Sequence, residues 1–224
     1  MRALLDLVLP LECAGCGSRG VVACAAGLRQ LAGQPRLAWP RPSPPGLPPP
    51  WAVAAYADHV RDFLLAYKED GVVGLRRPLG AALTSSLRAA MPSDERPVLV
   101  VPVPSSRAAR RRRGCDVVAD VALTAVTRLR AEGHPVRVVR ALRHARRVAD
   151  SAGLTAAERS ANLARAFVVR PGHARQLAGS SVVVVDDLVT TGVTLSECSD
   201  TLRRVGADVV AVATIAATTR HFAG

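Results

Sequence analysis

The stretch Ser181–Leu195 reads SVVVVDDLVTTGVTL, and it is the part of the chain that decides the fold. Residues 182–185 form an unbroken run of valines, which is typical of a strand buried on both faces of a parallel sheet. Asp186 and Asp187 follow at the carboxyl end of this predicted strand. A hydroxyl-rich turn over 188–194 then leads into an amphipathic helix, so the pattern predicts a strand–turn–helix unit.

The turn that follows the two acids has the chemistry of a phosphate site. Ligands of open α/β sheets bind outside the carboxyl ends of the strands, where the first turn of a helix offers free N–H groups. Thr190, Thr191 and Thr194 add hydroxyl donors on either side of Gly192. The two carboxylates suit the hydroxyls of a sugar or a Mg²⁺ ion. An ordinary turn whose acids only cap a helix is the alternative, and it leaves the order of these residues unexplained.

The rest of the chain alternates between strand and helix patterns. This alternation predicts an α/β fold with a doubly wound, mostly parallel sheet. We expect three parts, namely a cysteine-containing segment over 1–34, a proline-rich linker over 35–50 and the main domain over 51–224. The expected strands are 51–57, 98–103, 136–139, 182–185 and 209–216, and the expected helices are 59–70, 74–90, 117–131 and 155–166.

The N-terminal segment carries a cysteine cluster. Cys13 and Cys16 form a C-x-x-C knuckle of the kind that binds Zn²⁺, and Cys24 follows eight residues later. Gly27 stands where a fourth cysteine is expected. Three interpretations stay open here: a zinc site that borrows a ligand such as His59, a metal-free turn, and a redox pair, the last being disfavoured by its sequence context.

Composition narrows the function classes. The formal charge is +12, which suits a nucleic-acid partner, but aromatic residues make up 3% of the chain and leave few platforms for stacking bases. No apolar run is long enough to span a bilayer, and the N-terminus lacks a convincing signal-peptide cleavage site. Five cysteines in this arrangement fit a reducing compartment, so we expect a cytoplasmic protein.

The stretch 182–194 resembles the phosphoribosyl pyrophosphate (PRPP) loop of type I phosphoribosyltransferases. The order of parts over 51–220 further resembles the ComF family of competence proteins, which join a small cysteine cluster to a type I phosphoribosyltransferase-like domain. The segments that carry this resemblance are AYADHVRDFLLAYKEDG at 55–71, VLVVPVPSSRAARRRRGCDVVADVA at 98–122, LTAAERSANLARAFVV at 154–169 and the PRPP loop.

The resemblance implies roles for particular residues. It places the ribose 5′-phosphate in the turn 190–194 (Thr190, Thr191, Gly192, Val193, Thr194) and the ribose hydroxyls at Asp186 and Asp187. It implies that the arginine-rich loop 107–113 holds the pyrophosphate, with Arg107 and Arg113 as ligands. Lys68 could supply a further phosphate contact, or it could be a solvated side chain at the end of a helix. It makes Asp186, Asp187 and Arg113 the candidate catalytic residues. The arginines also have a simpler interpretation, as a solvated basic loop or a patch for a nucleic-acid backbone.

Two hypotheses about function follow from the resemblance. In the first, the protein is an enzyme that transfers phosphoribosyl from Mg²⁺-bound PRPP to an unknown nitrogen acceptor. In the second, it is a non-catalytic PRPP-binding accessory protein of DNA uptake, whose arginines contact single-stranded DNA or whose partners are other DNA-handling proteins. Thr190 stands where purine-salvage members of the superfamily carry an aspartate, which argues against a 6-oxopurine acceptor.

Overall fold

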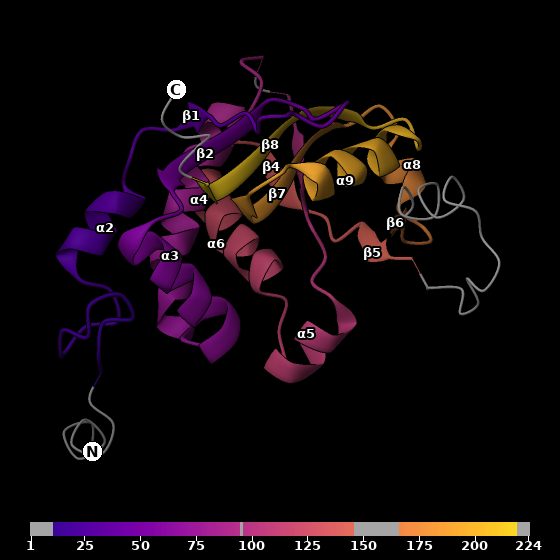
Figure 1. The fold of residues 1–224 in the computed structure, drawn as a ribbon. Coiled ribbons are helices and arrows are strands. Elements are labelled where there is room, and N and C mark those ends of the chain that lie inside the picture. The colour runs from indigo at the N-terminus through magenta and orange to yellow at the C-terminus, as the bar shows by residue number, and fades with distance from the viewer. Residues whose placement is uncertain (1–10, 95, 146–165, 219–224) are drawn as a thin grey trace.

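The computed structural model describes residues 11–94, 96–145 and 166–218, and its centre is a six-stranded sheet (Figure 1). The strand order is β1-β2-β8-β7-β3-β4, and every pair is parallel except β1 with β2. The predicted fold class is therefore confirmed. The strands of this sheet are β1 Arg36–Leu37, β2 Pro50–Ala55, β3 Val98–Pro102, β4 Val136–Val138, β7 Ser181–Val189 and β8 Asp208–Ala217.

Helices cover both faces of the sheet, and a small hairpin stands beside it. Strands β5 (Leu142–His144) and β6 (Phe167–Val169) pair antiparallel to form this hairpin. The helices are α2 Ala25–Leu31, α3 Asp58–Leu65, α4 Arg76–Ala90, α5 Arg107–Arg113, α6 Val117–Ala131, α8 Ala174–Leu177 and α9 Val193–Arg203, with a π-helical turn over Ala66–Asp70 and a 3₁₀ turn over Val73–Leu75. The helix expected over 155–166 lies outside the described residues.

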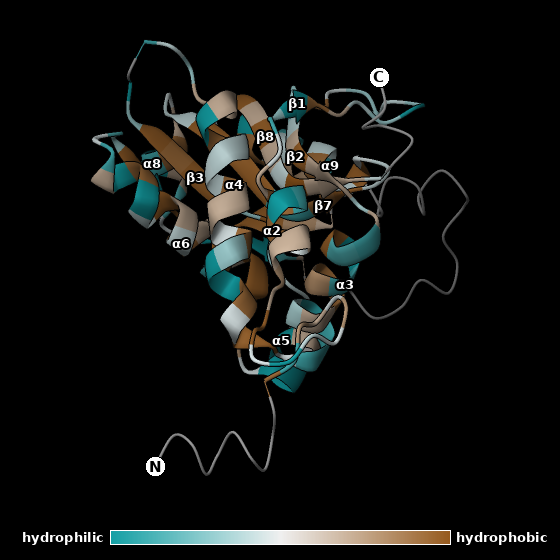
Figure 2. Ribbon diagram, turned by 90° about the vertical axis from the view of Figure 1, so that its left-hand side faces the viewer, coloured by the Kyte–Doolittle hydropathy of each residue, from teal (hydrophilic) through white to brown (hydrophobic). Residues whose placement is uncertain are grey.

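The valine run of β7 explains why the sheet is doubly wound. Successive strand residues point to opposite faces. Val183 and Val185 pack into the core beneath α4 and α6, whereas Val182 and Val184 pack into the core beneath α9. All four side chains are 0% exposed, so each face of this strand is apolar enough to bury a helix layer. Figure 2 shows the apolar strands enclosed between helices.

Strand β7 is longer than the sequence pattern predicts. We expected a strand over 182–185 followed by a turn from Leu188, but β7 continues to Val189. The reason is its neighbour β8, which is long enough to pair Asp186 with Thr214 and Val189 with Ala217. The turn is thereby reduced to 190–192, and the two acids lie inside the last part of the strand.

The proline-rich stretch 35–50 packs along the main domain. Its first residues form β1 at the edge of the sheet, and Ala38 and Leu47 are buried in the core beneath α9. Two side chains of α9 hold its backbone: the Ser196 hydroxyl donates to the carbonyl of Pro45 at 2.6 Å, and Arg203 donates to that of Gly46 at 2.5 Å. This stretch therefore supports the α9 side of the molecule.

Candidate functional site

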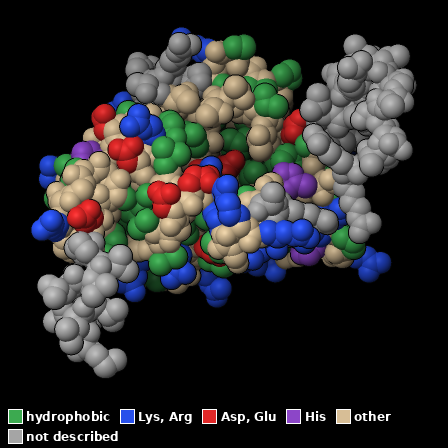
Figure 3. Space-filling view, turned by 60° about the horizontal axis from the view of Figure 1, so that its bottom comes forward, with side chains coloured by type: hydrophobic (Ala, Val, Ile, Leu, Met, Phe, Trp, Pro, Cys, Tyr) green, Lys and Arg blue, Asp and Glu red, His purple; other side chains and the backbone are tan. Residues whose placement is uncertain are grey.

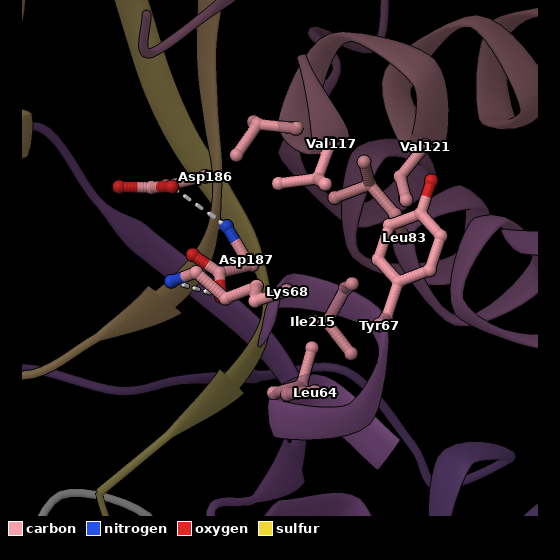
Figure 4. Close-up of a pocket in the computed structure, with 10 residues that line it drawn as sticks. Leu64, Tyr67, Lys68, Leu83, Val117, Val121, Asp186, Asp187 and Ile215 are labelled. Atoms are coloured by element: carbon pink, nitrogen blue, oxygen red, sulfur yellow. Dashed lines mark hydrogen bonds and ion pairs between the residues drawn. The ribbon is translucent and has the colours of Figure 1, made fainter. Parts of the chain in front are cut away.

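Asp186 and Asp187 lie at the carboxyl end of β7, near the middle of the sheet. The backbone N–H of Asp187 donates to a carboxylate oxygen of Asp186 at 2.9 Å, which fixes the first carboxyl group against the strand. An apolar wall of Leu64, Leu83, Val117, Val121 and Ile215 stands on one side of both acids (Figure 4). The other side opens into a cavity of about 200 Å³.

The hydroxyl-rich loop forms the rest of this cavity. Thr190, Thr191, Gly192 and Thr194 line it together with the two acids. Gly192 adopts φ +74°, a left-handed conformation that favours glycine, and it stands directly before the first residue of α9. No side chain caps the N-terminus of α9, so its first N–H groups point toward the loop. The side chains of Thr190, Thr191, Val193 and Thr194 are exposed.

Lys68 reaches the same cavity from the helical segment that follows β2. It lies in the π-helical turn that continues α3, and its Nζ is 2.8 Å from Oδ2 of Asp187. Burial alone lowers the pKa of Lys68, but the Asp187 and Asp186 carboxylates outweigh this effect and raise the pKa. The ammonium group is therefore fully charged at neutral pH. Single π turns within helices are common at functional sites.

The two acids differ in their surroundings. Burial raises the pKa of Asp186 well above its usual range, and the nearby Asp187 carboxylate raises it further. Asp187 instead forms the ion pair with Lys68. Tyr67, in the apolar wall, also has its pKa raised by burial, to about 12. The site thus holds one carboxyl group with a raised pKa beside one that is paired with a cation.

The arginine-rich stretch is a helix, not the loop expected from sequence. Ser106 caps α5 by accepting a hydrogen bond from Ala109 N–H, and Gly114 ends the helix with φ +72°. The Arg113 side chain is only 8% exposed because it folds inward, where it donates to the carbonyl of Lys68 at 2.6 Å. The structure therefore brings Lys68, the two acids and the threonine loop together, but it turns Arg113 toward the backbone. Only the backbone of Arg107, at the start of α5, is described.

Further charges on α5 are neutralised locally. Glu69 accepts a hydrogen bond from Arg112 and lies 3.6 Å from Arg113. Lys68 and Glu69 are neighbours in the π turn, so one helical tip contacts both the acids of β7 and the arginines of α5. Figure 3 shows acidic and basic side chains next to each other on this face.

A second, basic cleft of about 340 Å³ lies at the carboxyl end of β3. Three arginines, Arg110, Arg140 and Arg170, line it together with His173, beside Pro102 and Pro104. Asp116 is the carboxylate in the lining, and it accepts a hydrogen bond from Ser105 at 2.9 Å. Sequence reasoning did not select Arg140 or Arg170. The available signal for Arg140 was that it directly follows the strand expected over 136–139, whereas Arg170 follows β6, for which no strand was expected.

The three N-terminal cysteines come together in space. The sulfur atoms of Cys13, Cys16 and Cys24 all lie within 4.8 Å of one another. Cys13 is buried, whereas Cys16 is exposed. Three close thiol groups fit the preference of Zn²⁺ for sulfur ligands.

Comparison with known proteins agrees with the fold. Residues 115–221 match the family model of the phosphoribosyl transferase domain. No curated protein matches the chain. A solved structure described as the allosteric regulatory enzyme of purine biosynthesis shares 22% identity and a TM-score of 0.39. That match covers 61% of this chain and 24% of that chain, so this protein spans about a quarter of its length.

Within the described residues, no helix combines the length and the apolar character needed to cross a bilayer.

Proposed function

We propose that the protein binds Mg²⁺-bound PRPP and transfers its phosphoribosyl group to a nitrogen acceptor. The observation that carries this proposal is the single cavity at the end of β7, which combines two carboxylates, a lysine and a threonine loop at a helix N-terminus. Each part matches one group of the substrate. The matching family model over 115–221, which includes the acids and the loop, supports the same assignment.

The loop 190–194 would bind the ribose 5′-phosphate. A phosphate group accepts hydrogen bonds from the threonine hydroxyls and from the first N–H groups of α9, and the helix dipole favours its negative charge. Asp186 and Asp187 would accept hydrogen bonds from the two ribose hydroxyls. Mg²⁺ prefers carboxylate and phosphate oxygens, and it would supply positive charge to the leaving pyrophosphate.

The basic cleft would bind the pyrophosphate. Arg110, Arg140 and Arg170 line it at the end of β3, the strand next to β7. Guanidinium groups bind phosphate oxygens with two parallel hydrogen bonds, so they suit a leaving group whose charge grows in the transition state. Arg107 and Arg113 stay predictions as pyrophosphate ligands. In the structure Nη1 of Arg113 donates to the Lys68 carbonyl.

The first experiment is a ligand series on the full chain. Mg²⁺-PRPP, ribose 5-phosphate with Mg²⁺ and pyrophosphate with Mg²⁺ are compared for their effect on the melting temperature. We expect PRPP to stabilise the protein most, since it fills both clefts, and each fragment to stabilise it less. Pyrophosphate release is then measured with ammonia and with nitrogen bases. The absence of any PRPP effect would contradict the proposal.

The second candidate is a PRPP-binding protein that contacts DNA without turnover. The exposed side chains of Arg110, Arg111 and Arg112 on α5 favour it, together with the net charge of +12. A matched measurement separates the two candidates. Binding of single-stranded DNA that weakens steeply with salt, and that is lost on replacing these arginines by alanine, supports the DNA role. PRPP turnover by a protein without DNA affinity contradicts it.

The proposal also includes the resemblance to the ComF family. We infer a cytoplasmic protein in which the cysteine segment 1–34 and the proline-rich stretch 35–50 precede a phosphoribosyltransferase-like domain over 51–224. Zn²⁺ in the cysteine segment would have a structural role, because the three sulfur atoms lie away from the residues that line the PRPP cavity.

A further inference from the structure

Backbone N–H groups point at two of the three sulfur atoms in the cysteine cluster. The N–H groups of Gly15 and Cys24 donate to Sγ of Cys13, at 3.4 and 3.2 Å. Gly27 N–H donates to Sγ of Cys24 at 3.5 Å. Two of the three sulfur atoms thus accept backbone hydrogen bonds, and all three lie within 4.8 Å of one another. The residues present therefore fit a Zn²⁺ ion with one ligand still to be supplied.

Residue 27 has no room for the fourth ligand. A Cβ atom placed on Gly27 would lie 2.4 Å from Cζ of Phe63, far inside van der Waals contact. Phe63 belongs to α3 and is 0% exposed, so the packed core leaves no space into which its ring could move aside. The direction in which a fourth cysteine would project is therefore occupied by α3. The described side chains on that side of the cluster therefore belong to α3.

His59 stands in this place on α3, one helical turn before Phe63. Its Cβ lies 3.0 Å from the Cβ position of Gly27, and its ring atom Cδ2 lies 2.8 Å from that of Gly15. Gly15 is inside the C-x-x-C knuckle. The Nδ1 atom of His59 is buried and has no hydrogen-bond partner within the described part of the chain. A buried nitrogen without a partner costs free energy, so it calls for an explanation.

We propose that His59 is the fourth ligand of a Zn²⁺ ion held by Cys13, Cys16 and Cys24. In the structure His59 lies outside the set of ligand atoms within 4.8 Å. A half turn of its ring exchanges Nδ1 with Cδ2, and this places a nitrogen against Gly15. Coordination would then remove the unpartnered nitrogen and complete a Cys₃His site, one of the regular structural zinc sets.

The proposed ligand would connect the metal to the helical segment that carries Lys68. His59 and Lys68 lie on one continuous helical segment, formed by α3 and the π turn. Coordination through His59 would fix the N-terminal part of this segment to the cysteine cluster. The other end of the segment presents Lys68 to Asp187. The metal would thus stabilise the helix that carries the lysine without touching the substrate cavity.

X-ray absorption at the zinc edge tests the proposal on the unmodified protein. We expect one zinc per chain, with three sulfur atoms at about 2.3 Å and one nitrogen at about 2.0–2.1 Å. The nitrogen should carry the outer-shell scattering of an imidazole ring. Three sulfur atoms with an oxygen and no imidazole signal would overturn the proposal, and so would four sulfur atoms or a protein that binds no zinc.

Cobalt titration of variants gives an independent test. Replacing His59 by glutamine should weaken Co²⁺ binding by about tenfold or more and should change the visible d–d absorption, while the sulfur-to-metal absorption persists. Replacing Cys16 by serine should reduce the sulfur-to-metal absorption itself. His134→Gln is the matched control, because it removes an imidazole far from the cluster. An unchanged affinity and spectrum in His59→Gln would overturn the proposal.

Discussion

On the acidic side of the proposed substrate site, Asp186, Asp187 and the threonine loop come from one contiguous stretch of chain. On the basic side, Arg110, Arg140 and Arg170 come from three separate segments around β3 and the hairpin. The acidic side is set by one strand end and one helix start, so its geometry is local. The basic side depends on how α5 and the hairpin pack. The geometry of the acidic side can therefore be predicted from sequence, whereas that of the basic side cannot.

The two sides also differ in how their charges are balanced. Asp187 is paired with Lys68, and Glu69 lies beside Arg112 and Arg113. Lys68 and Glu69 are adjacent in the π turn. This one turn therefore neutralises part of the negative charge on the acidic side and part of the positive charge on the basic side. Arg110, by contrast, is an exposed residue that lines the basic cleft. The comparison predicts that changes on the acidic side act mainly on ribose phosphate binding, and that Arg110 acts on pyrophosphate binding.

Among the single substitutions, the largest change in ligand affinity is expected from Gly192→Ala, which strains the loop on the acidic side. A Cβ at this position would lie 3.0 Å from side-chain atoms of Leu47 and Pro40, at a backbone φ of +74°. The left-handed conformation costs an L-residue about 1–2 kcal/mol. We expect ribose 5-phosphate affinity, measured by calorimetry, to fall by about tenfold or more as the loop shifts.

Gly133→Ala is the matched control for this variant. Gly133 has φ +93° and open space around its Cβ position, so it carries a similar strain away from the site. It should lower stability by about 1 kcal/mol and leave ribose 5-phosphate affinity unchanged. Equal losses of affinity in both variants would mean that the loop geometry has no particular role.

A second prediction separates the two neighbouring acids by their pH dependence. Burial raises the folded-state pKa of Asp186, so the protonated carboxyl favours folding at low pH and this contribution is lost as pH rises through that pKa. Asp186→Asn mimics the protonated form. It should therefore raise the melting temperature at pH 8 by about 2–6 °C, and the difference should vanish below about pH 4.

Asp187→Asn should have the opposite sign. The change leaves the Lys68 ammonium group facing a neutral amide in place of its carboxylate partner. We expect a loss of about 0.5–1 kcal/mol in the free energy of unfolding at pH 8, measured by urea denaturation. If both variants shift stability in the same direction, the assignment of a protonation-prone Asp186 and a lysine-paired Asp187 is wrong.

A smaller effect is expected on the basic side, where the arginines of α5 should separate into two groups. Arg110→Ala should weaken pyrophosphate binding by about fivefold to tenfold, because a cleft-lining guanidinium is lost. Arg111→Ala, at an exposed neighbouring position, is the control and should leave that affinity unchanged. Calorimetric titration with Mg²⁺-pyrophosphate provides the measurement.

Arg113→Ala should act on stability instead. Its side chain is 8% exposed and holds the Lys68 carbonyl, so its loss should cost about 1–3 kcal/mol. A variant that keeps full stability but loses pyrophosphate binding would instead support the direct role that the resemblance implies for Arg113.

The sequence predicts those structural features that residues adjacent in the chain determine. The valine run predicts a strand buried on both faces, and Leu195, Cys198 and Leu202 predict the buried face of α9, which the structure bears out. Strand lengths are less predictable because they depend on partners: β7 extends to Val189 only because β8 is there to pair with it.

The sequence pattern does not predict contacts between segments that are distant in the chain. The arginine run identifies a basic element, but the inward turn of Arg113 depends on a carbonyl group contributed by α3 and its π turn. Gly27 was recognisable as a missing ligand, whereas the reason for the glycine is the Phe63 ring packed against it. A proline-rich composition predicts an extended chain, but not that Ala38 and Leu47 are buried beneath α9.

The measurement that tests the central claim most directly is calorimetric titration of Mg²⁺-PRPP into the unmodified protein and into Asp186→Asn/Asp187→Asn. The double variant keeps the size of both side chains and removes their charges, and its folding is checked by circular dichroism. We predict saturable binding to the unmodified protein and none detectable to the folded double variant. Absence of binding to the unmodified protein, or equal binding to both, would contradict the assignment of this cavity to PRPP.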